Sequence, residues 1–387
     1  ENRILCSTET TPCIQGIVFL GLIGFHDPIR ADVPAAIHTA QSAGLRPIVV
    51  TGDHRLTAEH VSREIGISII GTNVLQGGEL DTIDEKEFRE RVHEFDLYAR
   101  VLPHQKMKIV EAWQSRGAVV AMTGDGVNDA PAIKKADVGV TVGSGTEVAK
   151  EASDLVLLND SFSVIVAAIE EGRVIADNIR KSITLLLSTT FSEIVLIGGA
   201  LVMGLPLPIL PAQILWTNLI EEGFLSFAYA FEPAEGDVMR RQSQKKIKDS
   251  IFTNEMLFLI FGVGLITSFY LFGIYFVMLK LGYSLELIRT VTFAGVALDA
   301  LFFIFSLRSM RRPIWKISFF KNPVLLGAVG VSILFLLGAL TLGPLQRLLT
   351  LVPLSFNFYL LILGLGILNL VSVEAAKWFF IRKKIAD

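Results

Sequence analysis

Cysteine is scarce in this sequence, which contains only Cys6 and Cys13. Two cysteines are too few for a disulfide framework, and their spacing is not that of a metal site, so we assign them no role. The sequence also lacks a signal peptide at its start, a low-complexity segment and an obvious repeat. These absences argue against a disulfide-stabilised or repetitive architecture. The chain opens at Glu1, without a methionine, in what we expect to be the middle of a domain.

Charged residues are also sparse, at 19% of the chain, whereas hydrophobic residues make up 51%. This balance excludes a soluble protein of ordinary composition. Residues 1–182 have an ordinary charged content, and residues 183–381 hold most of the long apolar runs. We therefore expect a soluble half followed by a membrane half. The net charge of −3 says little about partners, and we expect no nucleic acid among them.

One motif in the soluble half suggests metal chemistry: Thr123-Gly-Asp-Gly-Val-Asn-Asp-Ala-Pro131, which follows the apolar run 118–122. That run predicts a buried parallel strand, which places Asp125 at the strand's carboxyl end, where open α/β sheets bind ligands. Asn128 and Asp129 then begin the next helix. Such oxygen ligands suit Mg²⁺, which usually shares its sites with a phosphate. The alternative is an Asp/Gly turn without a ligand, because short motifs often match by chance.

Strand and helix patterns alternate through the soluble half, which predicts a parallel, doubly wound sheet. Glycines and prolines bound the helical stretches between the strands. The polar, acidic segment 71–94 is interpreted as a surface insertion. The predicted strands are 16–22, 46–50, 96–99, 118–122, 138–142 and 154–158.

Three polar groups follow strand ends in this pattern and are therefore expected to meet at one edge of the sheet. They are the hydroxyl of Thr51, the ammonium of Lys106 and the carboxylate pair of Asp125 and Asp129. Together they provide what a phosphoryl group needs around it. Taken alone, Lys106 is better explained as a solvated helix lysine and Thr51 as a turn residue.

The order of these motifs resembles the phosphorylation domain of P-type cation-transporting ATPases, a member of the haloacid dehalogenase superfamily. The resemblance rests on Thr51–His54, on Ala99-Arg-Val-Leu-Pro-His-Gln-Lys106 and on the nine-residue motif. Asp27-Pro-Ile-Arg30 resembles the family's hinge, and Gly143–Leu158 follows its pattern. The resemblance covers nearly the whole chain. It implies an α/β haloacid-dehalogenase-like (Rossmann-like) domain followed by an all-α transmembrane domain of six helices.

The nucleophile of that family is absent. The family phosphorylates the aspartate of an Asp-Lys-Thr-Gly-Thr motif, and this sequence has neither that motif nor the Thr-Gly-Glu-Ser loop that dephosphorylates the intermediate. We interpret the chain as the C-terminal portion of a pump, inactive alone, whose missing N-terminal part is a partner. A soluble-type phosphatase on a membrane anchor would need an Asp-x-Asp nucleophile, which is also absent. A natural, silent half-pump subunit remains an alternative. The expected divisions are a nucleotide-domain remnant with the hinge strand (1–24), the phosphorylation domain (25–160), a stalk helix (161–182) and the transmembrane domain (183–387).

The resemblance also implies roles for single residues, with ATP as substrate and Mg²⁺ as cofactor. Asp125 would hold Mg²⁺, while Asn128 and Asp129 would position its loop. Lys106 would stabilise charge on the phosphate, and Thr51 would hydrogen-bond to phosphate oxygens. The implied catalytic residues are Thr51, Gly52, Asp53, Lys106, Asn128 and Asp129, the implied Mg²⁺ residues are Asp125 and Asp129, and the implied nucleotide contacts are Arg30 and Arg100.

Six apolar stretches are long enough to cross a lipid bilayer, which takes about 20 residues of helix. Cations concentrate in the linkers 239–248 and 308–321 and in the tail after 381, so the soluble half and the C-terminus should be cytoplasmic. Six spans match the P2-type pumps of the family, whereas heavy-metal pumps have two at this point. The predicted spans are roughly 183–204, 209–231, 256–280, 287–307, 323–343 and 356–381.

Few ionisable groups lie inside these spans, and intramembrane carboxylates suggest an ion pathway. Asn218, Glu221 and Glu222 share one helix face, as do Thr190 and Glu193 on the preceding span. Up to four carboxylates favour a divalent cation, Ca²⁺ first, although a proton, Mg²⁺ or Na⁺/K⁺ pump is also compatible. A carboxylate near a span end could instead lie at the headgroups. The transported-ion candidates are Thr190, Glu193, Asn218, Glu221, Glu222 and Asp299.

Overall fold

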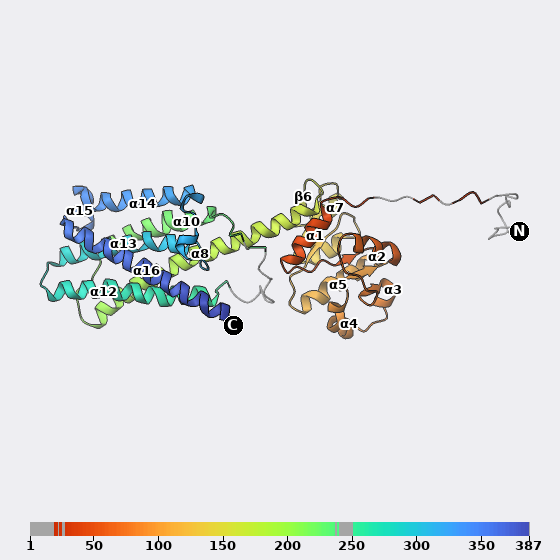
Figure 1. Ribbon diagram of the computed structural model, residues 1–387, viewed down its shortest axis with the longest axis horizontal. Helices are drawn as coiled ribbons and strands as arrows, with labels where there is room; N and C mark the ends of the chain where they lie inside the picture. The colour runs from red at the N-terminus through yellow and green to blue at the C-terminus, as the bar shows by residue number, and fades with distance from the viewer. Residues whose placement is uncertain (1–18, 22, 25–27, 237, 240–250, 387) are drawn as a thin grey trace.

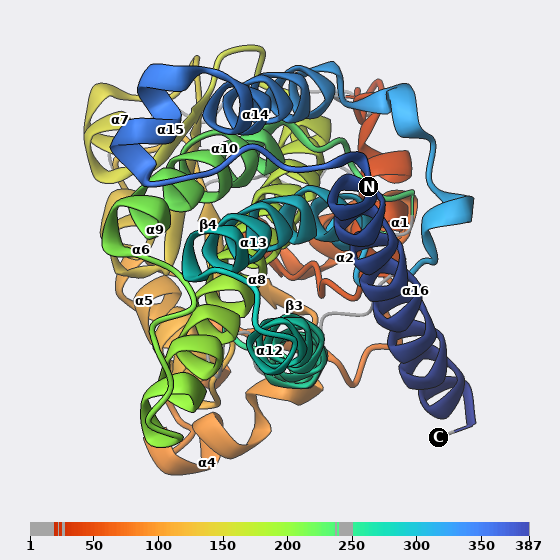
Figure 2. The same cartoon turned by 90° about the vertical axis from the view of Figure 1, so that its left-hand side faces the viewer.

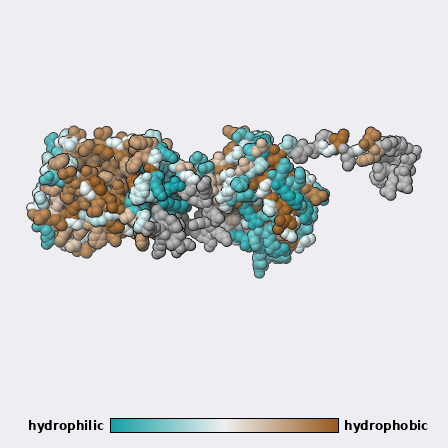
Figure 3. Space-filling view, in the orientation of Figure 1, coloured by the Kyte–Doolittle hydropathy of each residue, from teal (hydrophilic) through white to brown (hydrophobic). Residues whose placement is uncertain are grey.

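The computed structural model describes residues 19–21, 23–24, 28–236, 238–239 and 251–386. A soluble α/β domain and a bundle of helices lie at opposite ends of one long helix, α8 (Phe162–Val202), as Figure 1 shows. Hydrophobic side chains dominate the surface of the bundle and hydrophilic ones that of the soluble domain (Figure 3). The predicted division into a soluble and a membrane half is therefore confirmed. Cys6, Cys13 and nearly all of the predicted remnant 1–24 lie outside the described residues.

The soluble domain alternates short strands with helices, as the sequence predicts. Pro103 occupies the first turn of α5, where its missing N–H costs nothing, and Gly117, at φ +80°, follows the end of that helix. The strands are β1 (Val49–Val50), β2 (Val74–Gln76), β3 (Leu97–Ala99), β4 (Ala121–Thr123), β5 (Val138–Val142) and β6 (Leu155–Leu157). The helices are α1 (Val33–Ser42), α2 (Arg55–Glu64), α3 (Gly77–Leu80), α4 (Glu85–Arg91), α5 (Pro103–Ser115), α6 (Ala130–Lys135) and α7 (Glu147–Ala152).

These strands are parallel but form two sheets rather than the single sheet we predicted. Their orders are β1-β3-β2 and β4-β5-β6, so β1 and β4 each pair on one side only within the described part of the chain. Of the predicted strand 16–22, most lies outside the described residues, and Phe19, Leu20 and Gly21 adopt no regular structure.

The segment 71–94 is not a surface insertion, contrary to our prediction. It contains β2, which pairs with β3, and its apolar side chains enter the core. Val74 and Leu75 are buried, and Phe88 packs edge-on against Tyr98 with ring centroids 6.3 Å apart. Burial raises the pKa of Tyr98 above its usual range. The acidic residues of the segment lie on the exposed faces of α3 and α4 and in the turns beside them, so the overall polarity of the segment was misleading.

Helix α1 ties the soluble domain to the start of α8. Ala36 and Ala40 pack against Val166, and Arg173 of α8 donates from Nη2 to the carbonyl of Ala43, 2.8 Å away, at the end of α1. At the other end of α1, Ser161 donates a hydrogen bond to the carboxylate of Asp32. This contact lowers the pKa of Asp32. The predicted stalk helix therefore exists and continues without a break into the first span.

Five helices of the described chain are long and apolar enough to cross a membrane. Helix α13 is the most enclosed, with 78% of its apolar window buried, and Figure 2 shows it in the middle of the bundle. The short helix α15 (Gly343–Leu349) follows α14. The spans are α8, α11–α12 (Asn254–Lys280), α13 (Leu285–Leu307), α14 (Pro323–Thr341) and α16 (Phe356–Ala386), of which residues 356–379 form the apolar part.

The predicted span 209–231 is helical but is not one continuous α-helix. It consists of α9 (Pro211–Asn218), a π-helical segment η2 (Leu219–Leu225), α10 (Ser226–Ala228) and a final 3₁₀ turn η3 (Tyr229–Phe231). Periodicity in a sequence does not distinguish the wider π turn from an α turn. The π segment contains Glu221 and Glu222, and π turns are frequent at functional sites.

Candidate functional site

The loop after β4 holds Asp129 against Lys106. Asp129 precedes α6, and one of its carboxylate oxygens contacts the ammonium of Lys106, which projects from α5. The amide of Gly126 donates to the other oxygen at 3.4 Å. A side chain at Gly124 would meet Asp129, since an added Cβ would lie 2.5 Å from its Cβ. The structure thus brings together two of the predicted site residues from α5 and from the nine-residue motif.

The backbone of Asp125 is fixed while its side chain is exposed. Its carbonyl accepts hydrogen bonds from the amide (2.9 Å) and hydroxyl (3.2 Å) of Thr146, which also caps α7. The hydroxyl of Thr141 on β5 holds the carbonyl of Gly124 at 2.7 Å. The neighbouring Asn128 is exposed as well. A carboxylate on a pinned loop fits Mg²⁺, but no three acidic, histidine or cysteine side chains gather among the described residues, so a metal here would need further oxygen ligands.

Thr51 lies at the carboxyl end of β1. Its amide donates to the carbonyl of Tyr98 at 2.9 Å, and its hydroxyl accepts from the amide of Asp53 at 3.1 Å. No hydrogen bond or ion pair in the described chain joins Thr51, Gly52 or Asp53 to Lys106 or Asp125, and β1 and β4 belong to different sheets. The predicted convergence of Thr51 with the other groups therefore stays a prediction.

The two arginines predicted to contact nucleotide have different hydrogen-bond partners. Arg30 donates from Nη1 to the carbonyl of Asp160, 2.7 Å away, immediately before α8. Asp160 has φ +53°, and its carboxylate accepts the amide of Ser144 at 3.1 Å, which lowers its pKa. Arg100 is exposed, with φ +54° and its amide bonded to the carbonyl of Asp53 at 3.0 Å. Arg30 thus links the hinge to the stalk. The other hinge residue, Asp27, lies outside the described residues.

In the membrane half, α8 and the broken span run antiparallel as neighbours. Thr217 donates to Glu193 Oε1 at 3.4 Å, and nearer the soluble domain the hydroxyl of Ser182 donates to the carbonyl of Ser226 at 3.0 Å. This register sets Glu193 level with Thr217. Glu221 therefore lies about one helical turn, roughly 5–6 Å, closer to the soluble domain. The side chain of Glu222 lies outside what the structure describes.

The remaining ion candidates differ in burial. Glu221 is only 1% exposed, Glu193 and Asn218 are partly buried, and Thr190 is exposed. Thr190 and Glu193 were predicted to share a helix face. Because Thr190 is exposed, it does not lie in an enclosed site. Thr217 contacts Glu193 from the next helix and was not among the predicted site residues. Its position four residues before Glu221, on the same helix face, is the sequence feature that could have identified it.

Asp299 is linked to two other helices, α12 and α16. It accepts a hydrogen bond from the amide of Asn369 on α16, which in turn accepts from Thr267 on α12 at 2.9 Å. Sequence reasoning could not find Asn369 or Thr267, because only the fold brings three helices together. Asp299 also lines a small cavity together with hydroxyl residues of α8. The polar residues of that cavity are Ser188, Thr189, Ser192, Thr267 and Asp299.

Two protein families match most of the chain between them. Residues 5–137 match the family described as haloacid dehalogenase-like hydrolase, and residues 206–379 match that described as cation transporting ATPase, C-terminus. The two matches correspond to the soluble domain and to the helical bundle beyond α8.

Curated relatives are similar over both parts. The chain is 38% identical over 359 residues to the "Calcium-transporting ATPase" of Bacillus subtilis, an alignment covering 91% of this chain and 40% of that protein. It is 42% identical over 255 residues to the "Endoplasmic reticulum calcium ATPase srcA" of Aspergillus fumigatus, covering 64% and 26%. It is 38% identical over 324 residues to the "Probable cation-transporting ATPase F" of Mycobacterium bovis, covering 82% and 35%.

The chain thus spans less than half the length of these relatives, while the alignment with the Bacillus subtilis protein covers 91% of the chain. The resemblance inferred from the motifs is therefore borne out by both halves of the molecule. By its haloacid-dehalogenase-like domain, its apolar helical bundle and its calcium-transporting relatives, the chain belongs to the P-type cation-transporting ATPases.

Proposed function

We propose that the chain is the C-terminal portion of an ATP-driven pump that moves a cation, Ca²⁺ first, through an aspartyl-phosphate intermediate. The contact of Lys106 with Asp129, beside the exposed carboxylate of Asp125, carries the proposal. Asp125 would hold Mg²⁺, which supplies charge neutralisation at the phosphoryl group. Lys106, oriented by Asp129, would present its ammonium to the same oxygens. A preorganised cation at this point stabilises charge that develops during phosphoryl transfer.

The phosphorylated aspartate would come from a part of the protein outside this chain. Thr51 and Asp125 follow β1 and β4, and each of these strands is a sheet edge in the described chain. A further strand between them, carrying the aspartate at its carboxyl end, would join both sheets and set the nucleophile between Thr51 and Asp125. The cation-rich linkers suggest that the soluble domain faces the cytoplasm.

The chain alone should form no acyl-phosphate, because its groups stabilise charge but none is the nucleophile. The measurement is incubation of the purified chain with radiolabelled ATP and Mg²⁺, followed by acid precipitation and hydroxylamine treatment. In the full-length protein the label should appear, and Asp125→Asn should abolish it. An acid-stable, hydroxylamine-labile phosphoprotein formed by this chain alone would contradict the assignment.

The ion site should depend on Glu193 and Glu221. In the full-length protein, Glu193→Gln and Glu221→Gln should each raise the Ca²⁺ concentration needed for phosphorylation from ATP by about tenfold or more, because a charged ligand is lost. Phosphorylation by inorganic phosphate, which needs an unloaded site, should survive. The matched control is Glu286→Gln, an exposed glutamate at the start of α13. Unchanged ion affinity in both variants would leave Asp299 as the remaining predicted ion ligand whose carboxylate the structure describes, whereas a response to Mg²⁺ or pH in place of Ca²⁺ would reassign the ion.

A further inference from the structure

The loop 308–321, which joins α13 to α14, is strongly basic. It contains Arg308, Arg311, Arg312, Lys316 and Lys321 and has no acidic residue. Both of its neighbours are membrane spans. The loop lies at the end of the bundle nearest the soluble domain, and Figure 2 shows the light-blue segment before α14 at the rim of the molecule, outside the packed helices.

Arg308 fixes the inner part of this loop. Its side chain is 2% exposed, and its Nε lies 2.9 Å from Glu232 Oε1. Its Nη1 donates to the carbonyls of Ser318 (3.0 Å) and Phe319 (3.1 Å), which draws the far end of the loop back to its beginning. The charge of Arg308 is therefore neutralised internally and is not available to a partner.

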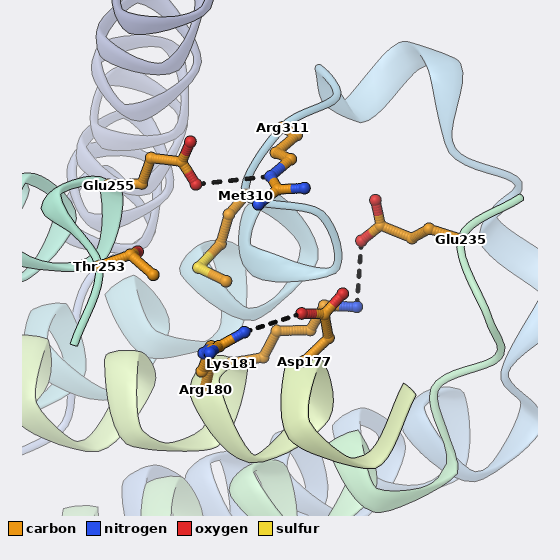
Figure 4. Close-up of a pocket in the computed structure, with 8 residues that line it drawn as sticks. All are labelled: Asp177, Arg180, Lys181, Glu235, Thr253, Glu255, Met310 and Arg311. Atoms are coloured by element: carbon orange, nitrogen blue, oxygen red, sulfur yellow. Dashed lines mark hydrogen bonds and ion pairs between the residues drawn. The ribbon is translucent and has the colours of Figure 1, made fainter. Parts of the chain in front are cut away.

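Three further contacts hold the loop to neighbouring elements. Ser309 donates to Glu235 at 3.0 Å, and the amide of Ile314 donates to Glu374 of α16 at 3.0 Å. Arg311 points toward Glu255, with the two charged groups 3.5 Å apart, as Figure 4 shows. The loop is thus held on one side by Glu235, which follows η3, and by Glu255 of α11, and on the other side by Glu374 of α16. Such a loop presents its outer side chains without first having to be ordered.

The outer surface of the loop alternates aromatic and cationic side chains. Trp315 is 66% exposed and Phe320 is 84% exposed. Lys316 and Lys321 beside them are exposed, and neither forms an ion pair with any residue that the structure describes. Exposed aromatic rings at the end of a membrane span are typical of the interface between headgroups and hydrocarbon. Unpaired cations at that depth attract anionic headgroups.

We propose that loop 308–321 binds the headgroups of anionic phospholipids, with Lys316 and Lys321 against phosphate groups and Trp315 and Phe320 at the upper edge of the acyl chains. The charge favours this occupant, because Lys316 and Lys321 are exposed and have no carboxylate partner among the described residues, whereas Arg308 and Arg311 are paired with Glu232 and Glu255. Its continuity with two spans places it at headgroup level. The inference does not depend on the transport cycle, because it concerns only how the chain sits in its bilayer.

The test measures the lipid next to Trp315. The whole chain is reconstituted in phosphatidylcholine nanodiscs containing brominated phosphatidylglycerol or, separately, brominated phosphatidylcholine at the same mole fraction. The part of the tryptophan fluorescence quenching that disappears in the Trp315→Phe variant comes from Trp315. It therefore reports which lipid lies next to the loop. We expect quenching by phosphatidylglycerol to exceed that by phosphatidylcholine, and this selectivity to fall about tenfold or more in the Lys316→Gln/Lys321→Gln double variant.

The matched control is Lys280→Gln, since this lysine ends α12 on the opposite side of the bundle. It should leave the selectivity at Trp315 unchanged. Far-UV circular dichroism of the double variant should match that of the parent chain, because both lysines are exposed. Equal quenching by the two lipids, or selectivity that survives in the double variant, would overturn the proposal and would point to a protein segment as the partner of this loop.

Discussion

Replacing Lys106 with methionine in the full-length protein is expected to slow formation of the phosphorylated intermediate by a factor of about 10² or more. Methionine keeps the length of the side chain but removes the ammonium that contacts Asp129. The side chains of both residues are only 13% exposed, so little water replaces the lost charge. The loss falls on the step in which charge develops on the phosphoryl oxygens. Rapid-quench measurement of labelled phosphoprotein gives the rate directly.

Lys108→Met is the matched control for this variant. Lys108 lies two positions further along α5, where its ammonium donates to the carbonyl of Leu80 at 3.1 Å and lies 5.8 Å from the ring centre of Phe88. It therefore faces away from Asp129. Its replacement should lower stability slightly and leave the phosphorylation rate near that of the parent. Equal rates for the two variants would remove Lys106 from the phosphoryl site.

Arg308→Leu should lower the free energy of unfolding of the membrane half by about 3–5 kcal/mol, the scale for leaving one charge of a buried pair without its partner. Glu232, the partner, is 5% exposed, and it also accepts a hydrogen bond from the buried Asn322 at 2.8 Å. Glu232→Leu should cost a similar amount. The Arg308→Leu/Glu232→Leu double variant should cost clearly less than the two single costs added together, because neither charge remains buried alone.

Denaturant titration in detergent micelles, followed by circular dichroism, measures these free energies. The control is Arg91→Leu, which removes the partner of Glu87 and Glu94 on the surface of α4. The Arg91 and Glu87 side chains are 44% and 53% exposed, so the expected change in unfolding free energy is small beside that of Arg308→Leu. Strict additivity of the two membrane-half substitutions would mean that Arg308 and Glu232 act separately and not as a pair.

The soluble domain could be predicted well wherever a pattern is local. The apolar run before Thr123 became the parallel strand β4, although its residues are exposed or half-buried and not buried as predicted. The segment 71–94 was misjudged because its charges outnumber the few apolar residues that enter the core. Pairing between strands that are distant in the chain has no local signature, so the separation of β1 from β4 could not be foreseen.

In the membrane half, length and hydropathy located the spans but not what their side chains touch. Glu193 and Asp299 were recognised because carboxylates are rare in apolar helices. Their actual contacts, Thr217 and Asn369, come from other helices and have no spacing that links them. The π segment around Glu221 was missed because a single wide turn leaves the apolar pattern of its helix nearly unchanged.

Helix α8 connects the two parts of the chain and can also transmit a tilt from one of its ends to the other. Its 41 residues contain no proline, so the rod is about 60 Å long, and tilting it by about 5° would carry one end about 5 Å sideways. No bend within the rod is needed to absorb such a tilt. The non-helical joints lie at its two ends, at Asp160 with φ +53° and at Gly204 with φ +65°. A small reorientation at Asp160, where Arg30 and Ser144 meet the helix, would therefore be delivered nearly undiminished to the depth of Glu193.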